Sequence, residues 1–228
     1  MAKAGGNDML KAISFDGNGV LYYRDNVGGD LICEYIKANY LPDLDLKASV
    51  TKYEELSILC MRNDLSKRQM LEEHLNYIGL SDQRARENVI AKEIEFSRAI
   101  HLYPTERETI LELNKMGIKM GMITNTVQTG EEKAMWFRQL GLDCVVEEVV
   151  SSIDIGISKP DPGIYREYIR RVGFEPGEIA YVAHDEIELI GAHQVGMVTI
   201  SFNYNGNFKA DYNLVLFKDL LDIPILSC

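Results

Sequence analysis

The strongest constraint on the fold comes from short apolar runs that recur along the chain between longer amphipathic stretches. Runs of this length that are apolar at most consecutive positions are typical of parallel strands buried on both faces. They lie at Ala12–Phe15, Lys119–Ile123, Glu148–Ser151, Ile179–Ala183 and Met197–Ser201. Helical patterns separate the later runs, and strands that alternate with helices build a parallel sheet. The sequence therefore predicts an α/β fold with these strands in one sheet.

Three helix starts can be recognised from their capping residues. Thr105–Glu108 and Ser66–Gln69 are both typical of a capping box, in which the hydroxyl residue and the Glu or Gln bond to each other's backbone amides. Asp161 followed by Pro162 predicts a third start, because Asp is favoured at the N-cap and proline at the first helical position. Gly117 and Gly173 are expected to end the helices that begin near Thr105 and Asp161.

A long segment between the first and second strands has a different pattern. From Tyr23 to Ile100 it contains no strand-like run, and apolar residues recur at helical spacing. A helical insert of this size is too large for a simple crossover between strands of one sheet. We therefore predict a separate all-helical lobe at residues 23–100 and a core domain formed by residues 1–22 and 101–228. The two connections are expected at Tyr22–Gly29 and Ala99–Pro104.

Composition excludes some classes of function. The 228 residues include 24 Lys and Arg against 35 Asp and Glu, a formal net charge of −11, and no basic run stands out, so nucleic acid is not expected as a partner. No apolar run approaches the roughly twenty residues of a membrane span, so no membrane association is expected. The four cysteines are scattered and the start of the chain shows no secretory pattern. We expect a cytoplasmic protein; the sequence does not indicate its oligomeric state.

Polar residues with chemical potential follow several of the predicted strands. Asp16 follows the first strand, Thr124 and Asn125 the second, and the segment His184–Glu186 the strand that ends at Ala183. Lys159 precedes the predicted helix start at Asp161. Because the carboxyl ends of parallel strands open into one crevice, these side chains are expected to converge there.

Such a set of side chains suits phosphoryl transfer. A carboxylate can attack phosphorus only when a cation and fixed donors offset the repulsion between two anions. Asp16 would attack and form an aspartyl-phosphate, and Asp185 would help to hold Mg²⁺, which prefers carboxylates, carbonyls and water. Thr124 and Lys159 would hold the transferring oxygens. Gly17 and Gly19 permit a tight turn that brings backbone groups close to the metal and the phosphate.

Four segments in this order resemble the motifs of the haloacid dehalogenase-like hydrolases, and the match covers nearly the whole chain. The segments are Phe15–Leu21, Ile123–Asn125, Ser158–Pro162 and His184–Asp185. The resemblance implies a Rossmann-like core with a helical cap that closes over the crevice, as in the branch with small-molecule phosphatases, β-phosphoglucomutase and haloacid dehalogenases. It implies a Mg²⁺-dependent phosphatase that acts on a small phosphorylated metabolite.

Site roles follow from the resemblance. Asp16, Asn18, Thr124 and Lys159 are the expected catalytic positions, and Gly17, Thr124, Asn125, Lys159 and Arg24 are expected to contact the substrate or its phosphate. The metal would be held by Asp16, the backbone carbonyl of Asn18, and Asp185. At the hinge, Tyr22, Tyr23 and Arg24 are candidates for substrate contact; simple hinge packing explains them equally well.

The chain departs from the family pattern at Asn18, where the phosphatases carry the aspartate that protonates the leaving alcohol and later activates water. An amide cannot do this, and lost acid–base assistance costs roughly 10² to 10⁴ in rate, so a slow phosphatase is expected. Three accounts of Asn18 stay open: natural divergence, an introduced substitution that traps the intermediate, or a partly inactive protein that still binds phosphate.

The fourth motif departs as well. His184 stands where glycine is usual, and we interpret it as a structural or gating residue. Glu186 and Glu188 are the later acidic candidates for a supporting role; Glu188 would position metal-bound water or bond to Lys159, or else be a solvated carboxylate at a helix start.

Two rival functions remain. One is a carbon–halogen hydrolase, which uses the same nucleophile without a metal. Such enzymes usually have an aromatic residue in place of Asn18, and a metal-free reaction would not need the Asp185 carboxylate. The other is a catalytically impaired phosphate-binding or regulatory protein, which Asn18 alone supports.

Overall fold

The computed structural model describes residues 9–25 and 28–226. It confirms the α/β fold: within these residues one sheet of parallel strands has the order β3-β2-β1-β4-β5-β6. The strands are β1 (Ala12–Phe15), β2 (Lys119–Thr124), β3 (Glu148–Ser151), β4 (Ile179–Ala183), β5 (Val198–Phe202) and β6 (Tyr212–Leu214). Three strands have their predicted bounds, β2 ends one residue later, and β5 lies one residue further along. The short edge strand β6 was not predicted.

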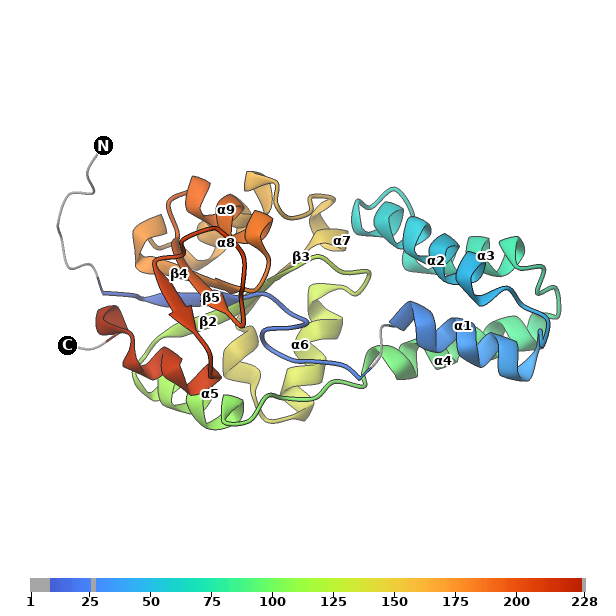
Figure 1. The fold of residues 1–228 in the computed structure, drawn as a ribbon, viewed down its shortest axis with the longest axis horizontal. Helices are drawn as coiled ribbons and strands as arrows, with labels where there is room; N and C mark the ends of the chain where they lie inside the picture. Colours follow the sequence, from blue (N-terminus) through green and yellow to red (C-terminus); the bar gives the residue numbers. More distant parts are fainter. Residues whose placement is uncertain (1–8, 26–27, 227–228) are drawn as a thin grey trace.

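Helices cover both faces of the sheet (Figure 1). They are α5 (Glu106–Lys115), α6 (Gly130–Gln139), the single turn α7 (Ser152–Ile155), α8 (Pro162–Val172) and α9 (Glu186–Gln194). Successive residues of a strand point to opposite faces, so neighbours enter different cores. Val182 packs with residues of α5 and α6 on one face, whereas Tyr181 and Ala183 pack with residues of α8 and α9 on the other. This two-sided burial fixes the strand ends that carry the polar residues.

The helix starts agree with two of the three predicted caps. Ser66 and Gln69 form the expected capping box. Asp161 accepts a hydrogen bond from the Gly163 amide at 2.7 Å, and Gly173 ends α8 in the left-handed conformation.

The predicted capping box at Thr105–Glu108 is wrong. Thr105 has a left-handed backbone, with φ 66°, and its side chain makes no capping bond. A side-chain cap needs an extended backbone at the N-cap, which aims the hydroxyl at the amides of the first turn. The carboxyl group of Glu106 instead accepts a hydrogen bond from the Tyr103 amide at 2.7 Å, and Glu106 is fully buried.

The helices α1 (Gly28–Asn39), α2 (Leu46–Met61), α3 (Lys67–Tyr77) and α4 (Gln83–Ser97) form a lobe beside the sheet (Figure 1). All four fall within the predicted range 23–100. They share a hydrophobic cluster, into which the core domain contributes Val127 from the loop after β2. The two connecting segments are joined, because Tyr23 and His101 exchange backbone hydrogen bonds of 2.9 Å. Residues 1–8 of the predicted core, and 26–27 of the first connection, lie outside the described residues.

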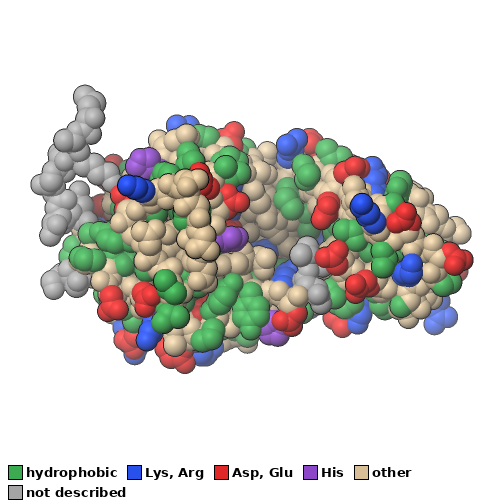
Figure 2. Space-filling model, in the orientation of Figure 1, with side chains coloured by type: hydrophobic (Ala, Val, Ile, Leu, Met, Phe, Trp, Pro, Cys, Tyr) green, Lys and Arg blue, Asp and Glu red, His purple; other side chains and the backbone are tan. Residues whose placement is uncertain are grey.

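The surface between the lobes is hollowed (Figure 2), and residues of both lobes line the hollow. On the face that Figure 2 shows, acidic and basic side chains are interspersed, and blue side chains form no continuous band. No helix in the described part of the chain has the length and hydropathy that a bilayer crossing requires.

Candidate active site

The loop after β1 is held tightly against the sheet. The Asp16 amide donates to the Val182 carbonyl at 2.9 Å, which extends the pairing of β1 with β4 by one residue. The Gly17 carbonyl accepts from the Leu21 amide at 2.9 Å, and the chain turns back on itself there. Asp16 is thereby fixed at the end of β1, with 8% of its surface exposed.

Lys159 contacts Asp16 at the end of β1. Its buried ammonium group donates to Asp16 Oδ1, to Glu188 Oε2 at 2.8 Å and to the Tyr181 hydroxyl at 2.9 Å. Burial opposes the charge on Lys159, but the carboxylates of Asp16 and Glu188 outweigh it, and the pKa of Lys159 is raised. Burial also raises the pKa of the Glu188 carboxyl, against the opposing effect of Lys159. The structure thus places Glu188 on Lys159, one of the alternatives proposed for it.

Asn125 acts on Lys159 through the backbone. Its side-chain oxygen accepts from the Lys159 amide at 2.8 Å, and its side-chain nitrogen donates to the Lys159 carbonyl at 3.0 Å. Both polar atoms of the amide are therefore used within the protein. Asn125 also lines the pocket, and its side-chain nitrogen keeps a second N–H, so the predicted contact with phosphate stays a prediction beside these bonds to the Lys159 backbone.

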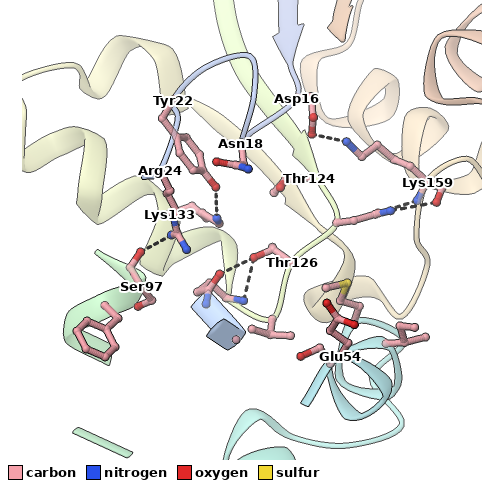
Figure 3. Close-up of a pocket in the computed structure, with 18 of the residues that line it drawn as sticks. Asp16, Asn18, Tyr22, Arg24, Glu54, Ser97, Thr124, Thr126, Lys133 and Lys159 are labelled. Carbon is pink, nitrogen blue, oxygen red and sulfur yellow. Dashed lines mark hydrogen bonds and ion pairs between the residues drawn. The ribbon is translucent and has the colours of Figure 1, made fainter. Parts of the chain in front are cut away.

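The hydroxyl of Thr124 faces the same turn. A Cβ atom at Gly17 would stand 3.0 Å from Thr124 Oγ1 and 3.2 Å from the Tyr22 hydroxyl, so glycine leaves room for both groups. Thr124 is buried at the end of β2. Asn18 lines the pocket, and in Figure 3 its side-chain amide points into the space beside Thr124.

His184 and Asp185 follow β4 on the other side of Asp16. His184 Nδ1 lies 3.6 Å from Asp16 Oδ2. Its ring fills the space beside Gly19, whose φ is +91° and where a Cβ atom would stand 2.5 Å from His184 Cε1. Asp185 caps α9 by accepting from the Ile187 amide at 2.9 Å, and it lines the pocket.

These groups suit a hard divalent cation. No cluster of three or more His, Cys, Asp or Glu side chains is arranged to hold a metal within residues 9–25 and 28–226. The predicted donors are two carboxylates, on Asp16 and Asp185, and the backbone carbonyl of Asn18. All three residues line one pocket, and Mg²⁺ commonly takes one or two carboxylates and completes its shell with water and substrate oxygens. The donor set fits Mg²⁺.

Glu186 does not reach this site. Its carboxylate accepts from the Tyr204 hydroxyl at 2.7 Å and from the Asn207 amide at 3.0 Å, and it is absent from the pocket lining. The predicted supporting role of Glu186 is therefore wrong: as the first residue of α9, its side chain points toward the loop after β5.

The pocket extends from Asp16 to the helical lobe and encloses about 700 Å³. Arg24 borders it and donates to the Ser97 carbonyl of α4, which ties the first connection to the lobe. Its guanidinium also lies 5.3 Å from the centre of the Trp136 ring. Arg24 was predicted to contact substrate, and hinge packing was the alternative; the structure places it in the pocket and in contact with the hinge at once.

Lys133 is the residue that the sequence analysis missed. It lies on α6, is 2% exposed, and donates to the Tyr22 hydroxyl at 2.5 Å. Its ammonium lies 4.3 Å from the centre of the Trp136 ring. Burial first, and then the charge of Arg24, lower the pKa of Lys133 well below its usual range. One signal was available: Lys133 stands three and four residues before Trp136 and Phe137, on the apolar face of its helix.

Comparisons with known proteins identify the family of this chain. The family model described as haloacid dehalogenase-like hydrolase matches residues 10–196, and the chain belongs to this family. A glyceraldehyde 3-phosphate phosphatase from Methanopyrus kandleri is 28% identical over 94% of this chain and 97% of its own length. An (S)-2-haloacid dehalogenase 4A from Burkholderia cepacia is 30% identical over 48% of this chain and 47% of its own.

A solved structure of 2-haloacid dehalogenase from Pseudomonas syringae pv. Tomato has the same fold. Its TM-score is 0.74 at 21% identity, and the alignment covers 94% of this chain and 97% of that chain. The family thus identifies a hydrolase, and the relatives that share it include proteins named as phosphatases and as dehalogenases.

Proposed function

We propose that this chain is a Mg²⁺-dependent phosphomonoesterase that acts on a small phosphorylated metabolite through an aspartyl-phosphate on Asp16. The observation that carries the proposal is the contact of a nearly buried Asp16 with Lys159, beside the second carboxylate of Asp185. A carboxylate attacks a phosphate ester only where positive charge is already in place, and Lys159 supplies it. The phosphatase relative from Methanopyrus kandleri supports the same reading.

The proposed reaction has two steps. A carboxylate oxygen of Asp16 forms a bond to phosphorus, the ester oxygen leaves with the electrons of its bond to phosphorus, and a proton from water neutralises it. Water then attacks the phosphoryl group, inorganic phosphate departs, and Asp16 is regenerated. Thr124 and Lys159 would hold the phosphoryl oxygens, and Mg²⁺, when bound, would supply charge stabilisation at these oxygens. Because Asn18 cannot exchange protons, we expect both steps to be slow.

Residues 23–100 would act as the cap of this enzyme over a core formed by residues 1–22 and 101–228. Its helices line the pocket together with the strand ends, so closure would exclude water from the reacting groups. A cytoplasmic enzyme acting on soluble metabolites is consistent with this arrangement.

One observation favours a second candidate, a carbon–halogen hydrolase. A halide leaving group needs no proton, so Asn18 would be no handicap for it, and the Burkholderia cepacia relative has a name of this class. The Asp185 carboxylate would then have no metal to bind.

The test compares wild type, Asp16→Asn and Asn18→Asp with p-nitrophenyl phosphate, an alkyl phosphate and 2-chloropropionate, each with and without Mg²⁺. We expect Mg²⁺-dependent ester hydrolysis that Asp16→Asn abolishes. We expect Asn18→Asp to raise turnover of the alkyl phosphate by roughly 10² or more, because this poor leaving group needs the acid most. Metal-independent chloride release without ester hydrolysis would favour the dehalogenase. Mg²⁺-dependent phosphate binding without any turnover would leave a phosphate-binding protein.

A further inference from the structure

A second cationic cluster borders the pocket, away from Lys159. Its members are Arg24, Lys133 and the Tyr22 hydroxyl that accepts from Lys133. In Figure 3 this group and Lys159 stand on either side of Asn18 and Thr124. The phosphoryl-transfer chemistry proposed above uses Lys159 but does not use this cluster.

Acidic residues act on this cluster only from beyond ion-pair distance, as far as the described residues show. Lys159 has two carboxylates within ion-pair distance, and the pocket residue Glu93 pairs with Lys67 at 3.0 Å. Within the described part of the chain, neither Arg24 nor Lys133 lies within 4.0 Å of a carboxylate. Arg24 Nε is buried and has no hydrogen-bond partner among the described residues.

A buried ammonium beside a half-buried guanidinium is costly, because each group loses hydration and repels the other. The repulsion is visible in the lowered pKa of Lys133, to which Arg24 contributes after burial. Contact with the Trp136 ring offsets only part of this cost. An anion bound between the two groups would offset the repulsion and accept their unused hydrogen bonds. A purely structural role for the two cations would leave Arg24 Nε without a hydrogen-bond partner.

The cluster lies close to the expected phosphate. The Tyr22 hydroxyl and Thr124 Oγ1 both stand within 3.2 Å of the point where a Gly17 Cβ atom would be. A ligand that reached from Thr124 to Lys133 would therefore be short, with a few atoms between its two anionic groups.

On the basis of the proposed function, we propose that Arg24, Lys133 and Tyr22 form a subsite for a carboxylate at the end of the substrate that is not transferred. The substrate class is then a small phosphorylated carboxylic acid. A second phosphate is a poorer fit, because Asp25 and Glu54 also line the pocket and would repel a doubly charged group. A planar carboxylate matches the paired donors of a guanidinium.

The first test uses substrates that differ only at this end. They are phosphoglycolate against 2-hydroxyethyl phosphate, and 3-phosphoglycerate against glycerol 3-phosphate and glyceraldehyde 3-phosphate. We expect kcat/KM to favour the carboxylate of each set by roughly 10- to 100-fold, as a charge-assisted contact would give. Calorimetric binding of phosphoglycolate and 2-hydroxyethyl phosphate with Mg²⁺ gives the same comparison without turnover.

The second test removes the cations singly, with Arg24→Gln and Lys133→Met. Each substitution is expected to bring the ratio of kcat/KM between the carboxylate and hydroxyl substrates toward one. Arg98→Gln is the matched control: it removes an exposed arginine next to Ser97, outside the pocket lining, and should keep the wild-type ratio. Because Arg24 is only half buried, we expect Arg24→Gln to fold, and this variant tests the subsite even where the Lys133 variant does not fold.

The outcomes separate the two proposals. Ester hydrolysis without preference for the carboxylate, or equal losses on all substrates in both variants, overturns the subsite and leaves the phosphatase standing. Carboxylate-dependent binding that Arg24→Gln abolishes, in a protein that hydrolyses no ester, supports the subsite and overturns the phosphatase.

Discussion

Glu106 provides a quantitative test of the structure, because its carboxyl is buried at the first turn of α5. Burial raises its pKa from the ordinary 4.5 to about 9, against the smaller opposing effect of the Tyr103 amide. The folded protein therefore holds a proton there between these two pH values, and the unfolded chain does not. Stability from this group is complete below pH 4.5 and is lost as the pH rises to about 9.

The magnitude follows from the linkage. Each pH unit in this window costs about 1.4 kcal/mol of unfolding free energy, so the step from about pH 6 to about pH 8 costs about 3 kcal/mol. Glu106→Gln mimics the protonated form and has no such dependence. We expect its advantage over wild type to grow by about 3 kcal/mol across this step, in urea unfolding followed by circular dichroism.

Glu108→Gln is the control, since Glu108 lies exposed on the same turn of α5. Its difference from wild type should be small and nearly constant with pH. A constant difference between Glu106→Gln and wild type over the same range would exclude a raised pKa for Glu106, because it would show that Glu106 ionises in the folded protein as it does in the unfolded chain.

Three further predictions concern single residues. Burial lowers the pKa of His74 from 6.5 to about 4, so the helical lobe should lose about 3 kcal/mol of stability as the pH falls through this window. Urea unfolding of His74→Gln with the same pH slope as wild type would contradict this. Gly19→Ala should cost roughly 1–3 kcal/mol, from its positive φ and the clash with His184, and His184→Gly should restore part of the loss in thermal unfolding. Asn125→Ala should lower kcat by about 100-fold with little change in KM, because Lys159 loses its backbone support; an unchanged kcat would exclude this role.

The convergence of Asp16, Thr124 and Asp185 on one pocket could be predicted from the sequence because it depends on topology. These residues lie at or just after the carboxyl ends of strands in one parallel sheet, and this topology brings strand ends together whatever the details of side-chain packing. The helices α1 to α4 could also be expected, because residues 23–100 contain no strand-like run and are too many for a simple crossover.

The parts that could not be predicted depend on tertiary contacts. The side chain of Asn125 is hydrogen-bonded to the backbone of Lys159, which lies 34 residues further along the chain. The carboxylate of Glu186 accepts a hydrogen bond from the Tyr204 hydroxyl. Lys133 becomes a pocket residue only because Tyr22 and Trp136 enclose it. Thr105 fails as a cap because of its backbone conformation, which the residue types do not reveal.

The edge strand β6 illustrates a different limit. It has three residues and pairs with β5 only, so its apolar pattern is too short to distinguish it from a loop. Its position at the edge of the sheet leaves the site unaffected.

The proposed mechanism requires that Asp16 become phosphorylated, and Asn18 makes this directly observable. Without an acid and base at position 18, hydrolysis of the aspartyl-phosphate should be slow, and the intermediate should accumulate. The measurement is intact-mass and peptide mass spectrometry of protein quenched in acid after incubation with p-nitrophenyl phosphate and Mg²⁺. We predict a gain of one phosphoryl group on the peptide that contains Asp16, which is absent in Asp16→Asn and weaker in Asn18→Asp. Ester hydrolysis by the wild type with no phosphorylated Asp16 at any time would exclude an aspartyl-phosphate intermediate.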